Sequence, residues 1–415
     1  MEKAALWSNP DFRWLLIGQT VSQFGSSVTG FAMPWLILQL TGSALQMGVG
    51  FAVGFLPYLL LSLPAGVWAD QYNRKHIMVM ADLARGILTL VVPITHWLGR
   101  VSVVEIYVVM ALISVFNALF DASSVSCVPN IVEKYQVRQA NSAMQAGTSA
   151  SQVVGPVLAG IAVTVMGAPN TMIADAVSYF VSAATLIVMK RAFSTGARKA
   201  QAGLMQQIAE GLQYVWTTDL IRMMALFAFG VNLGGSAARS LLLYRLQHDL
   251  HVSAYWSGLV MTGGSVGTIL GSVVSAVVAT RFRMGLILMV SLFFLSVPDF
   301  IIAWTTVPSL IGVANVIYGI AAVMWNIQSM SFRQSIIPDE MLGRVSSSTR
   351  IIVWGANPIG NTLGGIAGQW FGAPAVFVAA STLRLIIWLA GWRTKLYKSA
   401  TAVESMKSSQ TPVGN

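Results

Sequence analysis

Charged side chains inside long apolar stretches are the residues of this sequence whose type and position suggest chemistry. An ionisable group within a bilayer costs about 2.5–3.5 kcal/mol on insertion scales and is a functional candidate by default. Asp82 and Arg85 are three residues apart, which places them on one face of a helix. Such groups can form structural ion pairs or carry a coupling proton. The set comprises Asp82, Arg85, Asp175, Arg239, Asp299 and Arg384.

Patterns for other chemistries are weak or missing in the sequence. It contains no H-E-x-x-H zinc pattern and no G-x-x-x-x-G-K-S/T phosphate loop, which disfavours an enzyme and ATP-driven transport by this chain. His248, Asp249 and His251 are too few ligands for a metal ion. The single Cys127 gives no cysteine framework. We therefore expect neither a metal nor a cofactor.

The composition is that of an integral membrane protein. Of 415 residues, 55% are hydrophobic and 10% are charged, whereas about 25% of the residues of a soluble domain are charged. The formal net charge is +10. Because the basic residues are scattered between apolar stretches, we exclude nucleic acid as a partner.

Apolar runs separated by Gly, Pro and charged residues predict twelve membrane-spanning helices. Lys and Arg are concentrated on the side that carries both termini, so the positive-inside rule places both termini in the cytoplasm. The predicted spans are residues 12–39, 45–68, 76–98, 102–124, 140–165, 170–189, 219–244, 254–279, 284–304, 308–332, 345–368 and 373–393.

A polar interval in the middle of the chain separates two halves. It begins as a Ser/Gly/Ala/Lys linker and continues with an apolar stripe from Leu204 to Trp216, which predicts a helix at the cytoplasmic membrane surface. The expected divisions are a bundle over 1–190, a linker with an interfacial helix over 191–216, a bundle over 217–400 and a disordered cytoplasmic tail over 401–415.

The halves are related by an internal repeat. With an offset of 205 residues, Gly155 and Gly167 match Gly360 and Gly372, together with several neighbours. A parallel repeat of six helices is the arrangement that permits two bundles to rock about a central site.

The loop after the second span carries a family signature. From Gly66 to Lys75 it reads GVWADQYNRK, which resembles the G-x-x-x-D-R-x-G-R-K motif of the major facilitator superfamily, most closely its macrolide-efflux and siderophore-exporter branch. The resemblance covers essentially the whole chain. It implies an all-α membrane protein with twelve transmembrane helices in two pseudo-symmetric six-helix bundles. The sequence departs from the motif at Gln71, in place of arginine, and at Asn73, in place of glycine.

The resemblance also implies a cytoplasmic latch between the halves. Asp70 would face the positive N-terminal end of the eleventh helix, expected near the capping-type run 346–348. Arg74 would pair with Asp121 at the cytoplasmic end of the fourth helix, as similar transporters pair these positions. A loop that is merely solvated is the alternative. The expected gating residues are Gly66, Asp70, Arg74, Asp121 and Arg344.

Glycines in two spans predict close helix crossings. Gly155, Pro156 and Gly160 in the fifth span are similar to the antiporter motif of the superfamily, and the proline would bend the helix. An antiport signature and an ordinary small-residue interface remain equally open there, and either would be a hinge-like packing seam. Glycines at 263, 267 and 271 in the eighth span are interpreted in the same way.

The resembled fold assigns places to the charges within the spans. Helices three, six, nine and twelve stand outside the central cavity, which makes structural pairing the favoured role of Asp82, Arg85, Asp175, Asp299 and Arg384. Arg239 belongs to the seventh helix near the outer interface. It either snorkels to the headgroups or contacts an anionic group.

The helices expected to line the cavity carry no carboxylate near the midplane but many neutral polar and aromatic side chains. Such a lining suits a bulky amphiphile, although a membrane aromatic more often packs in the core or faces lipid. The expected cavity residues are Gln19, Gln23, Phe31, Trp35, Tyr58, Phe116, Asn232, Arg239, Tyr318, Trp325, Asn326, Trp354, Asn357 and Asn361.

These features predict a secondary active transporter that exports a bulky amphiphilic molecule, drug-like, macrolide-like or siderophore-like, by alternating access. We expect it to be a monomer in the cell membrane, in bacteria the inner membrane, with the lipid bilayer, a small-molecule substrate and protons as its partners. Two alternatives remain open. One is uptake or facilitated transport of a nutrient or lipid, and the other is a non-transporting receptor or scramblase on the same scaffold.

Overall fold

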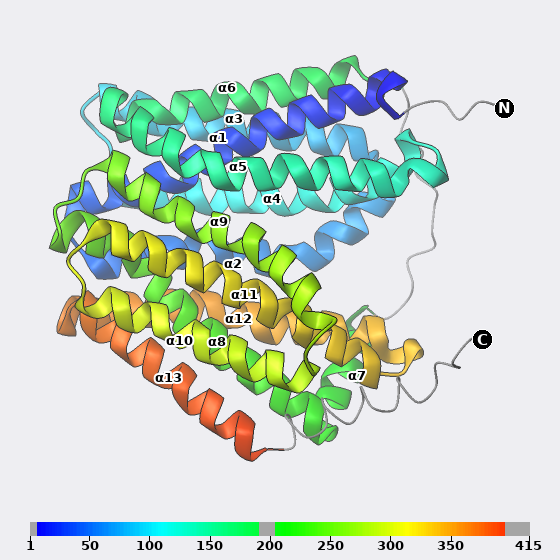
Figure 1. Ribbon diagram of the computed structural model, residues 1–415. Helices are drawn as coiled ribbons and strands as arrows, with labels where there is room; N and C mark the ends of the chain where they lie inside the picture. Colours follow the sequence, from blue (N-terminus) through cyan, green and yellow to red (C-terminus); the bar gives the residue numbers. More distant parts are fainter. Residues whose placement is uncertain (1–5, 191–203, 395–415) are drawn as a thin grey trace. The chain divides into compact units, whose positions relative to one another are not determined.

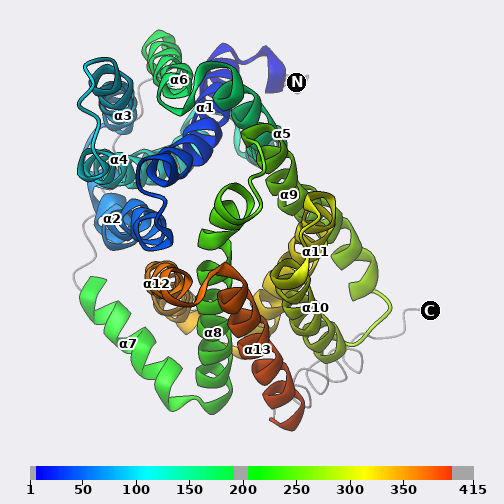
Figure 2. The same ribbon diagram turned by 90° about the vertical axis from the view of Figure 1, so that its left-hand side faces the viewer.

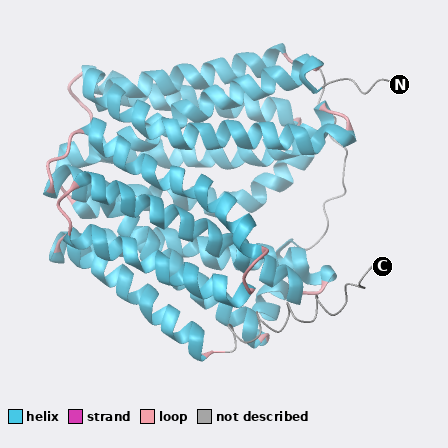
Figure 3. Ribbon diagram, viewed as in Figure 1, coloured by secondary structure: helices cyan, strands magenta, loops and turns pink. Residues whose placement is uncertain are grey.

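The computed structural model describes residues 6–190 and 204–394, and the regular elements in these ranges are all helices (Figure 3). Twelve of the described helices have 21 or more residues, which agrees with the twelve predicted spans. A shorter helix, α7 (Leu204–Thr217), forms where the interfacial helix is predicted. The all-α fold class is therefore confirmed. The expected tail and the first part of the linker lie outside the described residues.

The contacts divide the chain into two compact units, each with its own core (Figure 1). In unit 1, α1 packs against α5 and α6, α2 packs against α4, and α3 packs against α4 and α6. Figure 2 views these helices nearly end-on. They are α1 (Pro10–Thr41), α2 (Ala44–Gln71), α3 (Arg74–Trp97), α4 (Val103–Ile131), α5 (Val137–Met166) and α6 (Ala168–Val188).

Unit 2 contains the remaining helices. Its α12 packs against α7 and α8, while α10 packs against α11 and α13. The division falls within α9, whose residues up to Thr262 are grouped with unit 1. The helices are α7, α8 (Asp219–Tyr244), α9 (Ala254–Ala279), α10 (Met284–Trp304), α11 (Pro308–Ile336), α12 (Asp339–Phe371) and α13 (Ala373–Arg393).

Ten of the described helices are long and apolar enough to cross a membrane. The other two long helices, α1 and α12, have 32 and 33 residues but more polar sequences. A helix rises 1.5 Å per residue, so both still exceed the roughly 30 Å of a bilayer core.

The internal repeat reappears in the backbone. Gly167 ends α5 and Gly372 ends α12, with φ angles of 79° and 81°. An L side chain rarely adopts such an angle, whereas glycine does so without penalty. Each glycine is followed by a helix with proline in its first turn. The two halves therefore make the same helix-to-helix turn at equivalent positions.

The glycines of the eighth predicted span form a close helix crossing, as expected. Cβ atoms at Gly263, Gly267 and Gly271 would lie 2.5, 2.2 and 2.7 Å from backbone atoms of α11. Only glycine permits that approach, because any side chain would collide with the neighbouring backbone.

Two helices extend further at one end than predicted. The predicted fourth span ends at residue 124, but α4 continues to Ile131. The predicted eleventh span begins at residue 345, but α12 begins at Asp339 after Pro338. The acidic residues of its first turn favour a helix start there, because they complement the helix dipole. The expectation that the run 346–348 caps this helix is therefore wrong.

Candidate functional site

The predicted latch residues of unit 1 lie around the turn between α2 and α3. Arg74 Nη2 donates to Asp70 Oδ1 at 2.9 Å, and Arg74 Nε donates to the Ala69 carbonyl at 3.1 Å. Asn73 accepts from the amides of Lys75 and His76, so it caps α3 at the position where the family motif has glycine. The carboxylate of Asp70 remains half-exposed and accessible to a further partner.

Gly66 has open space where a side chain would stand, because a Cβ there would meet nothing within 4 Å. Local packing therefore does not require a glycine at this position. Its expected gating role stays a prediction.

Asp121 differs from its expected position and pairing. It precedes the end of α4 by ten residues, so it lies roughly 15 Å along the helix from that end. Its Oδ2 accepts from the Tyr58 hydroxyl at 3.0 Å, while Arg74 pairs with Asp70. The expected Arg74–Asp121 pair is therefore wrong. Asp121 is therefore not at the end of its helix, because the length of α4 was underestimated. That the cavity helices carry no carboxylate near the midplane stays a prediction.

Arg85 is the centre of a charged cluster at the junction of α3, α4 and α6. It forms the predicted ion pair with Asp82 and donates to Asn117 Oδ1 at 2.8 Å. Its guanidinium stacks on the rings of Phe120 and Tyr179, at 4.3 and 4.5 Å from their centroids. Asp82 and Arg85 are both buried.

Asp175 on α6 is a fully buried carboxylate beside this cluster. Its Oδ1 accepts from the Ser178 hydroxyl at 3.2 Å, and a Cβ at Gly25 of α1 would lie 2.6 Å from the same oxygen. Glycine therefore lets α1 pass close to the acid. We call Arg85, Asp82, Asp175 and Asp121 the unit 1 charge cluster.

A second buried ion pair joins α10 and α13 in unit 2. Arg384 pairs with Asp299, donates to the Leu295 carbonyl at 2.9 Å and reaches the Tyr318 hydroxyl at 3.5 Å. Arg384 and Asp299 are both buried. This geometry supports the expectation that Asp299 and Arg384 have a structural role.

Arg239 lies against the Tyr318 ring of this cluster. Its Nη1 donates to Asn315 Oδ1 at 2.9 Å, and its guanidinium stands 4.3 Å from the centroid of the Tyr318 ring. The side chain is exposed. Tyr318 therefore contacts two guanidiniums, those of Arg239 and Arg384. We call Arg239, Arg384, Asp299 and Tyr318 the unit 2 charge cluster.

The predicted cavity residues of unit 1 divide into polar contacts and packed aromatics. Gln19 is buried and donates to Ser124 Oγ at 2.5 Å, which ties α1 to α4. Gln23 Oε1 is buried without a hydrogen-bond partner among the described residues. Phe31 and Trp35 stack on each other and are buried, so their exposed area available for a ligand is small.

The predicted cavity residues of unit 2 also include hydrogen-bonded polar residues, buried aromatics and exposed residues. Asn232 bonds to the backbone of its own helix, and Asn357 accepts from Ser236 Oγ at 2.7 Å. Trp325 is buried in the core. Trp354 lies under Arg350, whose guanidinium is 5.4 Å from the ring centroid. Asn326 is exposed and Asn361 is half-buried. That these residues face one passage together with those of unit 1 stays a prediction.

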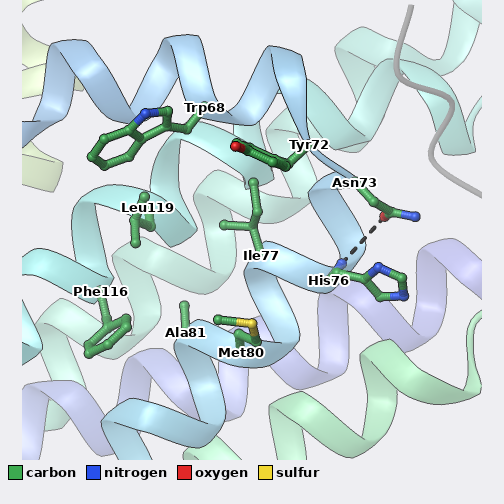
Figure 4. Close-up of a pocket in the computed structure, with 9 residues that line it drawn as sticks. All are labelled: Trp68, Tyr72, Asn73, His76, Ile77, Met80, Ala81, Phe116 and Leu119. Atoms are coloured by element: carbon green, nitrogen blue, oxygen red, sulfur yellow. Dashed lines mark hydrogen bonds between the residues drawn. The ribbon is translucent and has the colours of Figure 1, made fainter.

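Phe116 contributes to a pocket of about 420 Å³ formed by α2, α3 and α4 (Figure 4). The lining is largely aromatic and aliphatic, and its polar groups lie at the turn before α3. Sequence reasoning did not find this pocket, because its residues come from three helices. They are Trp68, Tyr72, Asn73, His76, Ile77, Met80, Ala81, Phe116 and Leu119.

Arg344, the predicted gating residue of unit 2, holds α7 against α12. Its Nη1 lies 2.8 Å from Glu210 Oε2. Two further contacts support this docking. Ser348 donates to the Ile208 carbonyl at 3.0 Å, and a Cβ at Gly211 would lie 2.4 Å from the Arg344 carbonyl oxygen.

The predicted hinge glycines of α5 make close contacts within unit 1. A Cβ at Gly155 would lie 2.4 Å from Ser27 of α1, and one at Gly160 would lie 2.5 Å from the carbonyl of Ala254. The Pro156 carbonyl lies 2.2 Å from where a Cβ of Gly258 would stand. The close-packed interface is therefore present, whereas hinge motion stays a prediction.

The sequence as a whole matches the model of the Major Facilitator Superfamily over residues 15–357. It is 26% identical over 394 residues to the multidrug efflux pump Tap of Mycolicibacterium fortuitum, covering 90% of this chain and 93% of that protein. It is also 26% identical over 403 residues to macrolide efflux protein A of Streptococcus pyogenes, covering 93% and 96% respectively.

Solved structures share the fold at low sequence identity. A bacterial homologue of the iron transporter ferroportin, solved in an inward-facing state, has a TM-score of 0.73 and 16% identity, with 94% of this chain and 99% of that chain covered. A mutant of the nucleoside transporter NupG has a TM-score of 0.75 and 11% identity, with 92% of this chain and 98% of that chain covered.

Proposed function

The chain belongs to the major facilitator superfamily, and we propose that it exports a bulky amphiphilic small molecule across the cell membrane by proton-coupled alternating access. It is a secondary transporter, not an enzyme. The names of its relatives, a multidrug and a macrolide efflux pump, support export of a molecule of that size. We further propose a monomer in the bacterial inner membrane with both termini in the cytoplasm.

The Tyr58–Asp121 contact is the observation that carries proton coupling. Asp82 and Asp299 each have an arginine partner, and Asp175 is fully buried. Asp121 is exposed, lies within a predicted span and forms no ion pair with any residue in the described ranges. Its one hydrogen-bond donor there is a neutral phenol. Such a carboxylate can take up a proton when it is cut off from water and release it when water returns.

Coupling follows from the two states of this carboxylate. Protonated Asp121 tolerates a dry environment, whereas ionised Asp121 favours the state in which water reaches it. Substrate and proton therefore exchange places if each favours a different access state. The proton gradient then drives the substrate outward.

The half-exposed Asp70 supports a gating role for the turn between α2 and α3. Arg74 holds Asp70 at the end of α2, and the carboxylate retains an accessible oxygen for a helix N-terminus. On this proposal Asp70 and Arg74 stabilise one access state and release it in the other. In unit 2, Arg344 contributes to gating by keeping α7 docked on α12.

The test uses purified protein in proteoliposomes loaded with a radiolabelled macrolide or an amphiphilic dye. We expect wild-type protein to move the compound against its gradient when a pH gradient is imposed. Asp121→Asn should abolish this uphill movement while retaining counterflow, because the substrate can still exchange without a titrating group.

Asp219→Asn is the matched control, since Asp219 is an exposed aspartate paired with Arg222 on α8. It should leave uphill movement intact. If the Asp121→Asn variant still moved the compound against its gradient, Asp121 would not take part in proton coupling. A wild-type protein that ignores the pH gradient would exclude proton coupling, and accumulation in the uptake direction would favour a nutrient transporter.

A further inference from the structure

Arg239 is an exposed guanidinium inside a membrane-spanning helix that forms no ion pair with any described residue. The nearby acid, Asp299, is already occupied by Arg384. The unit 2 charge cluster thus holds two guanidiniums and one carboxylate, which leaves an excess of one positive charge. A cation in this position is costly unless an anion or water compensates it.

The neighbours of Arg239 fix its orientation without neutralising it. Asn315 accepts one of its hydrogen bonds at 2.9 Å, and the Tyr318 ring lies against its plane at 4.3 Å. A guanidinium has five N–H donors, so this contact leaves most of them available. Holding the group in one orientation lowers the entropy cost of binding a second partner.

A glycine leaves room for the guanidinium against α9. A Cβ at Gly264 of α9 would lie 2.8 Å from Arg239 Nη2, so a larger residue there would displace the group. The available donors and the fixed plane together match the bidentate geometry in which arginine binds a carboxylate, sulfonate or phosphate.

We propose that Arg239 binds the anionic group of the transported molecule, so that the substrate class is an acidic amphiphile. This inference rests on the proposed export function and names the chemistry of its substrate. The apolar part of the molecule would lie on the surrounding aromatic and aliphatic side chains, as is usual for ligands of this kind.

The experiment measures binding of a matched pair of dansyl probes to the purified full chain in nanodiscs of zwitterionic lipid. One probe is a dansyl amino acid with a free carboxylate, and the other is its neutral methyl ester. We expect wild-type protein to bind the carboxylate roughly tenfold more tightly, the factor that one charge-assisted hydrogen bond supplies. Arg239→Gln should remove the preference and leave ester binding unchanged.

Two further variants keep the proposal falsifiable. Arg239→Lys keeps the charge but loses the planar fork, so an intermediate preference is expected. Arg350→Gln is the matched control, because Arg350 is also an exposed arginine stacked on an aromatic ring in unit 2. It should keep the full preference. If Arg239→Gln does not fold, the carboxylate preference measured for Arg239→Lys decides whether the proposal stands.

The position of Arg350 makes it a distant control. Gly360 packs on Leu233 and Gly364 on Ala237, so α8 and α12 run parallel. Arg350 lies ten residues before Gly360, and Arg239 lies six residues after Leu233. The two arginines are therefore roughly 24 Å apart along the helices.

The outcomes separate this inference from the export function. An unchanged preference in Arg239→Gln, an equal loss in Arg350→Gln, or a wild-type protein that prefers the ester would overturn the anion site while export stands. If neither probe binds and no compound is exported in the proteoliposome assay, the export function itself fails.

A lipid headgroup is the other source of an anion. Adding phosphatidylglycerol to the nanodiscs should leave the carboxylate preference intact if the anion belongs to the substrate. If phosphatidylglycerol abolishes the preference in wild-type protein, the site binds a headgroup and the assignment to a transported molecule is wrong.

Discussion

The charge clusters of the two units have opposite proportions of acidic and basic residues. The unit 1 charge cluster has one arginine, Arg85, and three aspartates, whereas the unit 2 charge cluster has two arginines and one aspartate, Asp299. The positions of ring and cation also differ between the two units. At the repeat offset of 205 residues, Tyr179 corresponds to Arg384. Tyr179 stacks on Arg85 of α3, whereas Arg384 stacks on Tyr318 of α11.

This difference indicates that the repeat preserves backbone geometry more strictly than charge. The turns at Gly167 and Gly372 are alike in their φ angles, while the ionisable residues that the two halves carry are not. An acid-rich cluster suits proton binding, and an arginine-rich cluster suits an anion. The two units therefore offer different chemistry on similar scaffolds.

The largest expected effect comes from the same substitution made in each unit. Asp299→Asn leaves Arg384 and Arg239 near each other with no acid, and arginine cannot lose its charge. We expect a loss of about 3–5 kcal/mol in the free energy of unfolding. Asp82→Asn should cost only about 1–2 kcal/mol, because Asp175 and Asp121 still act on Arg85.

Unfolding of the purified variants in one detergent, followed by tryptophan fluorescence, compares the two costs. Equal losses for Asp299→Asn and Asp82→Asn would show that the other aspartates of unit 1 do not compensate Arg85. The different proportions of acids and arginines in the two clusters would then not affect the free energy of unfolding.

Removal of the arginine of unit 1 should have a cost that depends on pH, unlike removal of the acid of unit 2. Arg85→Met leaves three carboxylates without a base and deletes the contacts with Phe120 and Tyr179. We expect a loss of about 3–4 kcal/mol at neutral pH, and a smaller loss in acid, because protonation neutralises the carboxylates. Asp299→Asn leaves only arginines, so its cost should not change with pH between 5 and 8. Melting temperatures at several pH values test this, and parallel pH profiles for the two variants would contradict it.

The sequence predicted the helices and the repeat, but it did not predict the partners of most charges. Long apolar runs determine the spans, and glycines spaced by four correctly predicted a close crossing of α9, although not its partner α11. The Asp82–Arg85 pair was predictable because its members are neighbours on one helix. Arg384 and Asp299 are separated by 85 positions, and nothing in the local pattern selects Asp299 over the other acids.

The misplacement of Asp121 has a definite physical cause. Hydropathy suggested an end near the polar residues at 121–124, but α4 continues for seven residues past residue 124, through the sequence VSCVPNI. Cys127, Val128 and Ile131 of this extension are buried in a core cluster of unit 1, so tertiary packing sustains the helix past the polar residues. A carboxylate expected at the end of the helix is therefore ten residues inside it.

A smaller effect is expected where unit 2 docks α7 on α12. Gly211→Ala places a methyl group about 2.4 Å from the Arg344 carbonyl oxygen, so the helices must separate. Overpacking of this kind costs about 1–3 kcal/mol. Limited proteolysis between α7 and α8 should be faster in this variant than in wild-type protein. Cleavage at the wild-type rate would show that α7 adapts without loss of docking.

The smallest effect is expected for the exposed ion pair at the same contact, which contrasts with the buried pair of Arg384 and Asp299. Arg344 and Glu210 are about 40% exposed, with side-chain values of 42% and 37%. Water already solvates both groups, so Glu210→Gln should cost at most about 1 kcal/mol in unfolding free energy. High salt should reduce even that difference, because it screens exposed charges. A loss approaching that of Asp299→Asn would mean that burial does not set the value of these ion pairs, and that Arg344 stabilises the unit as strongly as Arg384 does.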